Sequence, residues 1–225
     1  MMAGGERSNL HVHYSSELYD RYSASSLEAY DDLMLRRLVS ECRLRPSART
    51  LLDVGTGTAR FLLRVADDPA LQALHLTGTD FFDDMLVIAR RNVERANRGD
   101  RIELVHDDVH AMQFADARFD IAVSRSTIHH WADPVRALRE IDRVLAPGGV
   151  ALIHDVRRDP PADVLAAFNR RRADAGVEPS RLAEKYTVQE VRDFAERAGL
   201  GARALVTTAE RGFAALGMEL RIRKP

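Results

Sequence analysis

Short apolar runs alternate with amphipathic segments from residue 51 to residue 155, and this alternation constrains the fold more than any other feature of the 225-residue chain. Buried strands are predicted at 51–54, 74–79, 102–105, 119–124 and 150–155, and helices at 60–66, 83–96 and 134–145. Strands that alternate with helices form parallel βαβ units, whose right-handed crossovers place helices on both faces of one sheet. The sequence therefore predicts an α/β fold of the Rossmann-like, doubly wound type.

The segments on either side of this core extend the same domain. Apolar residues recur at three- and four-residue steps from 14 to 44, which predicts two N-terminal helices. A helix is predicted near 187–198, and strands near 203–208 and 218–223 are expected to pair as an antiparallel hairpin across the turn 212–217. The expected sheet has seven strands and is mostly parallel. We expect a single domain, 1–225, with a helical lid (1–45), a cofactor-binding core (46–156) and a substrate cap with the hairpin (157–225), in which 157–186 is irregular.

Charge and cysteine content narrow the classes of partner. The 33 basic and 34 acidic residues nearly cancel to a net charge of −1, so no basic field attracts nucleic acid or an anionic membrane. The single cysteine, Cys42, leaves no disulfide framework and no cysteine-based metal cluster. The start of the chain lacks the apolar segment of an export signal, and no later stretch is long and apolar enough to span a membrane. These features predict a cytoplasmic protein without a bound metal.

A glycine-containing turn follows the first predicted strand. Asp53 ends that strand, and Gly55, Thr56 and Gly57 lead into the next helix. Glycines at such a junction let a ligand approach the backbone, and the helix N-terminus offers free N–H donors. A dinucleotide fingerprint requires a third glycine where this chain has Arg60, which disfavours a nicotinamide cofactor. A lone Gly-x-Gly is equally typical of a turn that binds nothing.

Acidic residues end the next two predicted strands. Asp80 closes the second strand, where a carboxylate can accept hydrogen bonds from both hydroxyls of a ribose. Asp108 follows the third strand, and by itself it is better interpreted as part of a solvent-exposed acidic turn. Asp83 and Asp84 are better interpreted as helix-capping residues.

Taken together, residues 49–155 resemble the class I S-adenosylmethionine-dependent methyltransferases that act on small molecules. The likeness rests on 53–59, 78–86, 105–109 and 143–149, with Ala59 where the family often has a further glycine. The resemblance implies that S-adenosylmethionine is the cofactor and that Asp53 contacts its ammonium, while Gly55 and Gly57 line its methionine and ribose portions. It further implies the following contacts: Asp80 with the ribose, Phe81 and Met85 with the adenine faces, Asp108 and the N–H of Val109 with the adenine edge, and Thr56, Ser124 and Arg125 elsewhere along the cofactor site.

Histidines and tyrosines supply the candidate catalytic residues. His129 and His130 follow the fourth strand, where either could accept a proton from the methyl acceptor, although a structural role is somewhat favoured. Adjacent histidines point in different directions and have no further ligand at metal-binding spacing, so a metal site is rejected. Tyr14 and Tyr22 are the candidates for a lid over the sulfonium, because aromatic faces attract cations.

The leading hypothesis is methyl transfer by in-line displacement to an oxygen, nitrogen or carbon nucleophile of a small molecule. Two alternatives remain open at this point: an enzyme that cyclises S-adenosylmethionine itself and releases methylthioadenosine, and a nicotinamide-binding Rossmann protein. The arginines 170–172 could meet an anionic substrate, although a solvated helix face is the favoured interpretation. We expect a small-molecule substrate, no nucleic-acid or membrane partner, and either a monomer or a homodimer.

Overall fold

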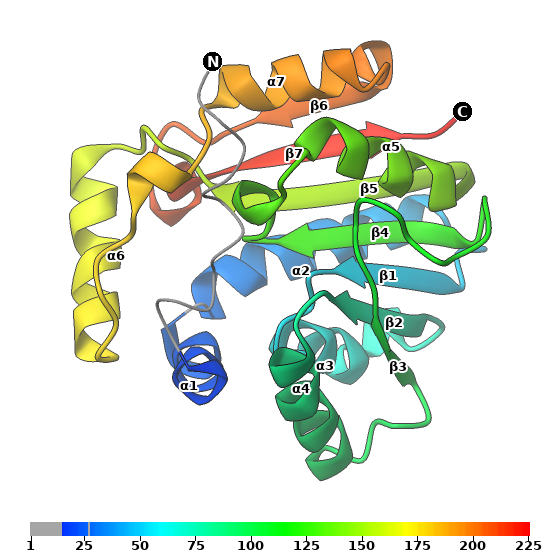
Figure 1. Cartoon of the computed structure of the whole chain (residues 1–225), viewed down its shortest axis with the longest axis horizontal. Helices are drawn as coiled ribbons and strands as arrows, with labels where there is room; N and C mark the ends of the chain where they lie inside the picture. The colour runs from blue at the N-terminus through cyan, green and yellow to red at the C-terminus, as the bar shows by residue number, and fades with distance from the viewer. Residues whose placement is uncertain (1–14, 27) are drawn as a thin grey trace.

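The protein is described by a computed structural model that covers residues 15–26 and 28–225. Its described residues form one seven-stranded sheet with the strand order β3-β2-β1-β4-β5-β7-β6 (Figure 1). The strands β1 to β5 pair in parallel, whereas β7 pairs antiparallel with both β5 and β6. The predicted fold class is confirmed. The strand bounds are β1 Thr50–Val54, β2 His75–Asp80, β3 Ile102–His106, β4 Phe119–Arg125, β5 Leu145–Val156, β6 Ala204–Thr207 and β7 Gly217–Arg223.

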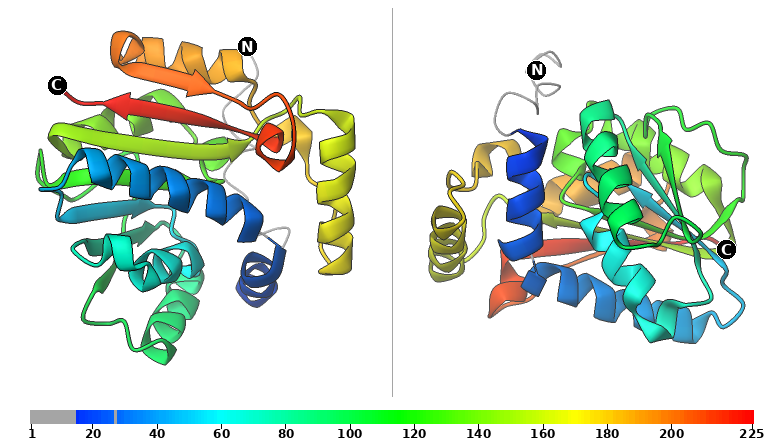
Figure 2. Two further views of the ribbon diagram at one scale, coloured as in Figure 1. Left: turned by 180° about the vertical axis from the view of Figure 1, so that it is seen from behind. Right: turned by 90° about the horizontal axis from the view of Figure 1, so that it is seen from below.

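Helices cover both faces of this sheet. α2, α3 and α4 pack on one face around Met34, Phe61 and Leu152, and α5 and α7 pack on the other around Phe119 and Leu138. Seen from behind, α2 lies across the sheet while α6 stands beyond one end of the strands (Figure 2). The helix bounds are α1 Ser16–Ser26, α2 Glu28–Leu44, α3 Arg60–Asp67, α4 Asp83–Arg95, α5 Pro134–Val144, α6 Ala162–Asp174 and α7 Val188–Arg197.

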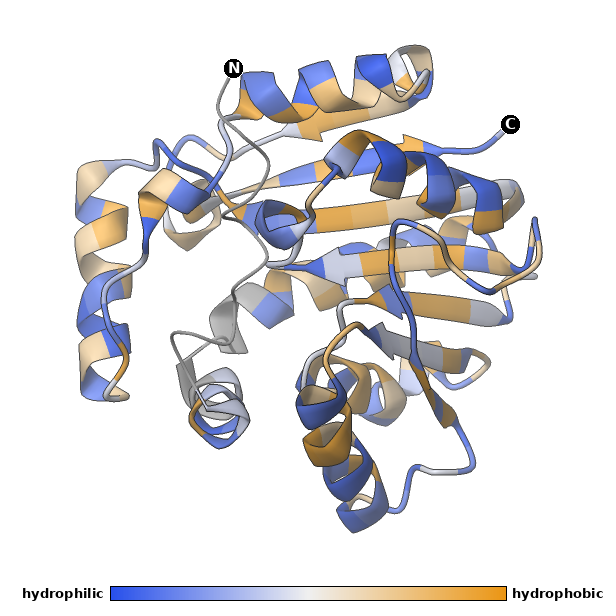
Figure 3. Cartoon of the chain, in the orientation of Figure 1, coloured by the Kyte–Doolittle hydropathy of each residue, from blue (hydrophilic) through white to orange (hydrophobic). Residues whose placement is uncertain are grey.

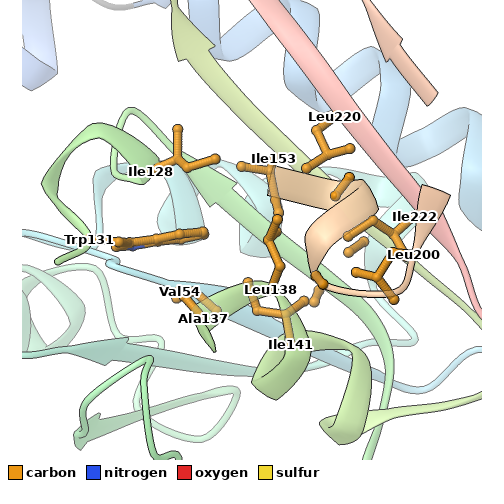
Figure 4. Packing of buried hydrophobic residues seen from close by; sticks show 14 of the residues in the cluster. Val54, Ile128, Trp131, Ala137, Leu138, Ile141, Ile153, Leu200, Leu220 and Ile222 are labelled. Carbon is orange, nitrogen blue, oxygen red and sulfur yellow. The ribbon is translucent and has the colours of Figure 1, made fainter. Parts of the chain in front are cut away.

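The core under α5 shows how the sequence builds these layers. Asp133 caps the helix by accepting from the Arg136 N–H at 3.0 Å, and Pro134 takes the first turn, where a missing N–H costs nothing. Leu138 and Ile141 then project from one helix face into the sheet (Figure 4). The facing strands β4 and β5 are mainly hydrophobic (Figure 3), so the apolar face of this helix is buried against apolar strands, and that burial is the main force that fixes the layer.

The structure corrects three local predictions. The segment 157–186 is not irregular throughout, because it contains α6, which starts directly after Pro161 and buries Val164 and Phe168 one turn apart. The fifth strand was predicted to begin at 150, whereas β5 begins at Leu145 and pairs irregularly with β4 near that point. The connection from β6 to β7 is longer than the predicted turn and contains the short helix η6 (Phe213–Leu216). The antiparallel pairing of β6 and β7 itself is confirmed.

Membrane insertion has no support from the described helices. None of them is both long enough and apolar enough to cross a bilayer.

Candidate functional site

The turn after β1 has an unusual backbone. Gly55, Gly57 and Ala59 adopt φ angles of 72°, 57° and 61°, in the left-handed region that favours glycine. The N–H groups of Gly55 and Thr56 both donate to the carbonyl of Thr79, each at 2.8 Å, so the turn is tied to the end of β2. A Cβ at Gly55 would lie 2.5 Å from the Thr127 methyl carbon. Glycine is therefore required here both by conformation and by space.

Asp53 is buried beneath this turn. Its carboxyl is 2% exposed and accepts a hydrogen bond of 2.8 Å from the Thr56 hydroxyl. Burial raises the pKa of Asp53 to about 7, although the Thr56 hydrogen bond and the charge of Arg125 oppose the shift. A carboxyl group held in this way gains from a nearby cation, because a cation favours its ionised form.

Asp80 ends β2 within reach of the same turn. One carboxylate oxygen accepts from the Gly57 N–H at 2.8 Å, and the other accepts from the Phe82 N–H at 3.0 Å. Burial raises the pKa of Asp80, and the two backbone donors counteract that effect. These bonds fix the direction of the carboxylate, and each oxygen keeps a second lone pair that can accept from a ligand hydroxyl.

The residues assigned to the adenine lie on the far side of Asp80. Phe81 is 58% exposed and stacks on the His106 ring, with centroids 6.1 Å apart, while Met85 is partly buried in the first turn of α4. Asp108 is tied to His110, whose backbone N–H and ring Nδ1 lie 2.9 and 2.6 Å from one carboxylate oxygen. Burial by itself would raise the Asp108 pKa, but these bonds to His110 outweigh it and lower the pKa. Val109 is partly buried against the core under α5.

Ser124 and Arg125, at the end of β4, have protein partners. The Ser124 hydroxyl donates to the Val54 carbonyl at 2.8 Å and also bonds the Thr127 hydroxyl, which joins β4 to β1 beneath the glycine turn. Arg125 forms a buried ion pair with Asp31 of α2 at 3.0 Å. These contacts position the turn and the N-terminal helices, and the assignment of both residues to the cofactor stays a prediction.

The first helix is docked over the glycine turn through polar groups. Asp20 accepts two hydrogen bonds from Arg60, at 2.8 and 2.6 Å, and a third from Asn92 at 2.8 Å. Burial alone would raise the Asp20 pKa, but the hydrogen bonds outweigh it and lower the pKa. Arg60, which replaces the third glycine of a dinucleotide fingerprint, thus anchors α1 to α3.

Tyr19 is the aromatic residue that α1 brings to the turn. Its ring carbon Cε1 would lie 3.1 Å from a Cβ placed on Gly57. Burial raises the pKa of Tyr19, although the charge of Arg125 opposes the shift. The sequence pointed to Tyr14 and Tyr22 instead, but Tyr14 and the Tyr22 side chain lie outside the described residues. A signal for Tyr19 exists in the buried polar positions of the same helix, Ser16, Asp20 and Ser23.

The two predicted histidines have different environments. His129 is buried, with Nδ1 2.6 Å from an Asp155 carboxylate oxygen and Nε2 hydrogen-bonded to the Lys185 amine. Burial lowers the His129 pKa, against the raising effect of Asp155. His130 is partly exposed, and its ring centroid lies 3.6 Å from that of His129. Asp155 and Lys185 were not identified from the sequence. The position of Asp155 near the carboxyl end of β5 was the available signal.

Metal binding has no support in the described part of the chain. Residues 15–26 and 28–225 contain no group of three or more histidine, cysteine, aspartate or glutamate side chains arranged to hold an ion.

The fold and site together define a class of protein. In an open α/β sheet, ligands bind at the carboxyl ends of the strands, where the strand order reverses. Here β1 and β4 flank that point, with the glycine turn and Asp80 beside it. A close backbone approach next to a fixed carboxylate suits a nucleoside ligand, so this is an α/β protein of the nucleoside-binding class.

Comparisons with known proteins specify the family. Residues 52–153 match a family model described as a methyltransferase domain. The ubiquinone/menaquinone biosynthesis C-methyltransferase UbiE of Roseobacter denitrificans is 30% identical over 191 residues, which cover 77% of this chain and 74% of that protein. The demethylmenaquinone methyltransferase of Thermus thermophilus is 34% identical over 136 residues, so the match spans 60% of each chain. A methyltransferase structure from Aquifex aeolicus superposes with a TM-score of 0.70 at 19% identity, covering 93% of this chain and 98% of that one.

The chain belongs to the class I S-adenosylmethionine-dependent methyltransferases. It is an enzyme that uses S-adenosylmethionine as its methyl donor. The nicotinamide alternative is therefore set aside.

Proposed function

We propose that this enzyme transfers the methyl group of S-adenosylmethionine to a ring carbon of a hydroxylated aromatic small molecule of the hydroquinone type. Two relatives, one of them similar over 77% of this chain, have names that specify quinone-related methylation, and this likeness supports the acceptor class. The structural observation that carries the proposal is the His129–Asp155 pair at the carboxyl ends of β4 and β5. A ring carbon becomes a strong nucleophile once a hydroxyl on the ring loses its proton, and the cluster that this pair forms with Lys185 lies where such a proton could be received.

The chain's own residues would hold the cofactor as follows. When bound, S-adenosylmethionine supplies an electrophilic methyl carbon on a sulfonium centre. The left-handed turn at Gly55 and Gly57 would place its backbone beside the ligand, and the buried Asp53 carboxyl favours the ligand's ammonium. Asp80 is oriented by two backbone donors and accepts from the ribose hydroxyls. Phe81, Met85, Asp108 and the Val109 N–H provide the adenine contacts, and Thr56, Ser124 and Arg125 hold the frame of the turn.

Positioning accounts for most of the catalytic effect that we propose. Holding two reactants in attack geometry is worth up to roughly 10 kcal/mol of the barrier without any proton transfer. The glycine turn, Asp80 and the docked helix α1 are tied together by hydrogen bonds, which suits this role. The ring of Tyr19 covers Gly57 and limits the access of water to that part of the site.

The experiment is a methyl-transfer assay with demethylmenaquinone reduced to its hydroquinone under nitrogen. We expect S-adenosylhomocysteine and a methylated product in equal amounts, detected by mass spectrometry. Release of methylthioadenosine without any acceptor would instead establish cyclisation of the cofactor, and methylation of a ring oxygen alone would contradict the carbon nucleophile.

A matched pair of variants tests the cofactor site. Asp80→Asn should weaken binding of S-adenosylmethionine about tenfold or more, because a hydrogen bond to a charged group is worth roughly 1.5–3 kcal/mol. Asp83→Asn should leave the affinity unchanged, since Asp83 is exposed at the start of α4. Equal losses for both variants, measured by calorimetry, would count against this assignment of Asp80.

A further inference from the structure

Lys185 differs from most basic residues of this chain because it is a lysine and not an arginine. Of the 33 lysines and arginines only Lys185 and Lys224 are lysines, so nearly every cationic position carries a guanidinium that keeps its proton. Lysine is the basic residue that can lose its proton when it is removed from water. The two lysines also occupy different environments, because the Lys224 amine donates to the Asp142 carbonyl at 2.7 Å on another part of the fold.

Lys185 is the outer end of a chain of three hydrogen-bonded groups. Its amine bonds the Nε2 atom of His129, whose Nδ1 lies 2.6 Å from an Asp155 carboxylate oxygen. The other Asp155 oxygen accepts from the Val156 N–H at 2.7 Å. The neutral tautomer with hydrogen on Nδ1 satisfies both bonds, because His129 then donates to Asp155 and accepts from Lys185.

The three hydrogen-bonded residues differ in their exposure to solvent. The side chains of His129 and Asp155 are 3% and 2% exposed, whereas Lys185 is partly exposed. Both ring nitrogens of His129 are already engaged. Lys185 is thus the most exposed residue of the cluster, and the imidazole has no ring nitrogen left for a further ligand.

The cluster lies close to the cofactor turn. Thr127 packs against Gly55, and His129 follows Thr127 by only two residues, so the Cα atoms of Thr127 and His129 are separated by at most about 7 Å. Figure 1 shows α6 and the segment that leads to α7 beyond the carboxyl ends of β4 and β5, on the same side as α1. Through its bond to His129, Lys185 therefore lies on the same side of the sheet as the glycine turn.

The charges around Lys185 do not fully offset the effect of burial on the pKa of its amine. Burial lowers the Lys185 pKa, and the carboxylates of Asp155 and Glu184 oppose the shift while the charge of Arg172 adds to it. Burial by itself would raise the Asp155 pKa, but the interactions with His129 outweigh it and lower the pKa. The titratable and charged groups near the amine come from β5, η3 (Ile128–His130), η4 (Leu182–Glu184) and α6: Asp155, His129, His130, Glu184 and Arg172.

We propose that Lys185 is a further catalytic residue, whose uncharged amine accepts the proton of the acceptor hydroxyl while His129 and Asp155 hold that amine in position. This inference rests on the proposed function, because it specifies the group that activates the acceptor. His129 is then a positioning residue, and the partly exposed His130 takes no part in the transfer.

The proton and electrons balance as follows. The O–H bond of the acceptor breaks, its electron pair stays on the acceptor, and the proton bonds to the lone pair of the Lys185 nitrogen. The ring carbon then forms a bond to the methyl carbon, whose bond to sulfur breaks with both electrons going to sulfur. A proton moves from that ring carbon to the oxygen as the aromatic ring is restored. The ammonium of Lys185 returns its proton to water when the product leaves.

Two lysines make a direct test possible without any turnover. Protein labelled with carbon-13 at the lysine Cε positions gives two signals, which Lys185→Arg assigns, and Lys224 is the internal control. We expect Lys185 to titrate at a clearly lower pH than Lys224, and His129→Gln to move only the Lys185 curve. Naphthol, added as a phenolic probe in the presence of S-adenosylhomocysteine, should shift only the Lys185 signal toward its protonated position. Coincident titration of the two lysines, or no response to naphthol, would overturn the proposal.

Kinetics give the second measurement. Lys185→Arg keeps the donors but carries a permanent positive charge and cannot accept a proton, so kcat should fall about 100-fold or more with little change in KM. Lys224→Arg should leave both constants unchanged. A Lys185→Arg enzyme that keeps its kcat would show that no proton acceptor is needed at this position, which overturns the proposal. Failure of the wild-type enzyme to methylate any hydroquinone, together with the expected lysine titration, would refute the acceptor class and leave the basicity of Lys185 established.

Discussion

Gly55 and Gly148 share a left-handed backbone but differ in what surrounds them. Their φ angles are 72° and 77°, so any L-residue at either position pays a conformational cost of roughly 1–2 kcal/mol. Gly148 is exposed and a Cβ there would meet nothing within 4 Å, whereas a Cβ on Gly55 would lie 2.5 Å from the Thr127 methyl carbon. Thr127 cannot easily move, because its hydroxyl bonds Ser124. Comparing substitutions at the two glycines therefore distinguishes the cost of backbone strain from the cost of steric overlap.

Gly148→Ala is expected to lower the free energy of unfolding by about 1 kcal/mol, through backbone strain alone. Gly55→Ala should cost roughly 3 kcal/mol, since overpacking adds about 1–3 kcal/mol to that strain. Urea denaturation of both variants measures the difference. In Gly55→Ala/Thr127→Ser the clashing methyl group is absent, so at least about 1 kcal/mol should be recovered. Equal costs for the two single variants would argue against a steric role of Thr127.

At the scale of elements, a partly buried ionic cluster ties α1 to α3 and α4. The Asp20 side chain is 9% exposed and binds both Arg60 and Asn92, whereas the side chain of Asp32, which pairs with Arg64 and joins α2 to α3, is 42% exposed. Surface pairs contribute about 0–1 kcal/mol, while removal of one partner from a buried pair costs several-fold more. The two aspartates therefore form a matched pair.

Asp20→Asn should destabilise α1 by roughly 2 kcal/mol, because it leaves the Arg60 guanidinium without its counter-ion. Hydrogen exchange of the α1 amides should accelerate about 10- to 30-fold, which is that free energy expressed as a rate ratio. Binding of S-adenosylmethionine should weaken in parallel, since α1 places Tyr19 over Gly57. Asp32→Asn serves as the control and should change exchange by no more than about threefold. If the two variants behaved alike, the proposed docking role of Asp20 would be wrong.

The same scale shows which elements a sequence can reveal. α5 was predicted from its apolar spacing, which is a local signal, and its cap Asp133 and first-turn residue Pro134 are equally local. α6 was missed because only Val164 and Phe168 are buried among many charged residues, and the surface that they cover is supplied by residues near 215. Local chemistry was visible in the sequence, whereas packing between distant segments was not.

The candidate site divides in the same way. The glycine turn and Asp80 could be identified because their backbone requirements are encoded within a few neighbouring residues. The hydrogen-bond partners of His129 lie far along the chain. Asp155 in β5 is 26 positions later, and Lys185 in the segment 157–186 is 56 positions later. Lys185 carries no pattern of its own, so only the fold could bring it to the histidine.

At the scale of the whole molecule, the net charge is nearly zero, but the acidic groups are unevenly distributed. Several carboxyl groups are buried at the carboxyl edge of the sheet, and burial raises the pKa of Asp53, Asp80 and Asp107. Acids with raised pKa values destabilise the folded chain at neutral pH, because the unfolded chain ionises them more easily. These buried carboxyl groups lower the free energy of unfolding at the site where a cationic ligand would raise it again. Such a loss of stability at a functional site is common in proteins.

The variant Asp53→Asn measures how much the buried Asp53 carboxyl lowers the stability of the folded chain. The pKa of Asp53 is about 7 in the folded chain against 3.8 for an ordinary aspartate. The contribution of a group with a raised pKa is fully present below the unfolded value and is lost as pH rises through the folded value. The advantage of Asp53→Asn over the wild type should therefore grow by roughly 2–3 kcal/mol between pH 5 and pH 8 in urea denaturation without cofactor.

Saturating S-adenosylmethionine should reverse that order at pH 8, because only an ionised Asp53 gains from the ligand's ammonium. Binding to the wild type should weaken as pH falls from 7 to 5, by up to about tenfold per pH unit, while the affinity of Asp53→Asn stays nearly flat. Calorimetry in two buffers of different ionisation enthalpy measures the accompanying proton release directly. The substitution leaves the local hydrogen bond in place, since the Thr56 hydroxyl can still donate to the amide oxygen of the variant. A wild type and variant with parallel pH profiles would place the ammonium away from Asp53.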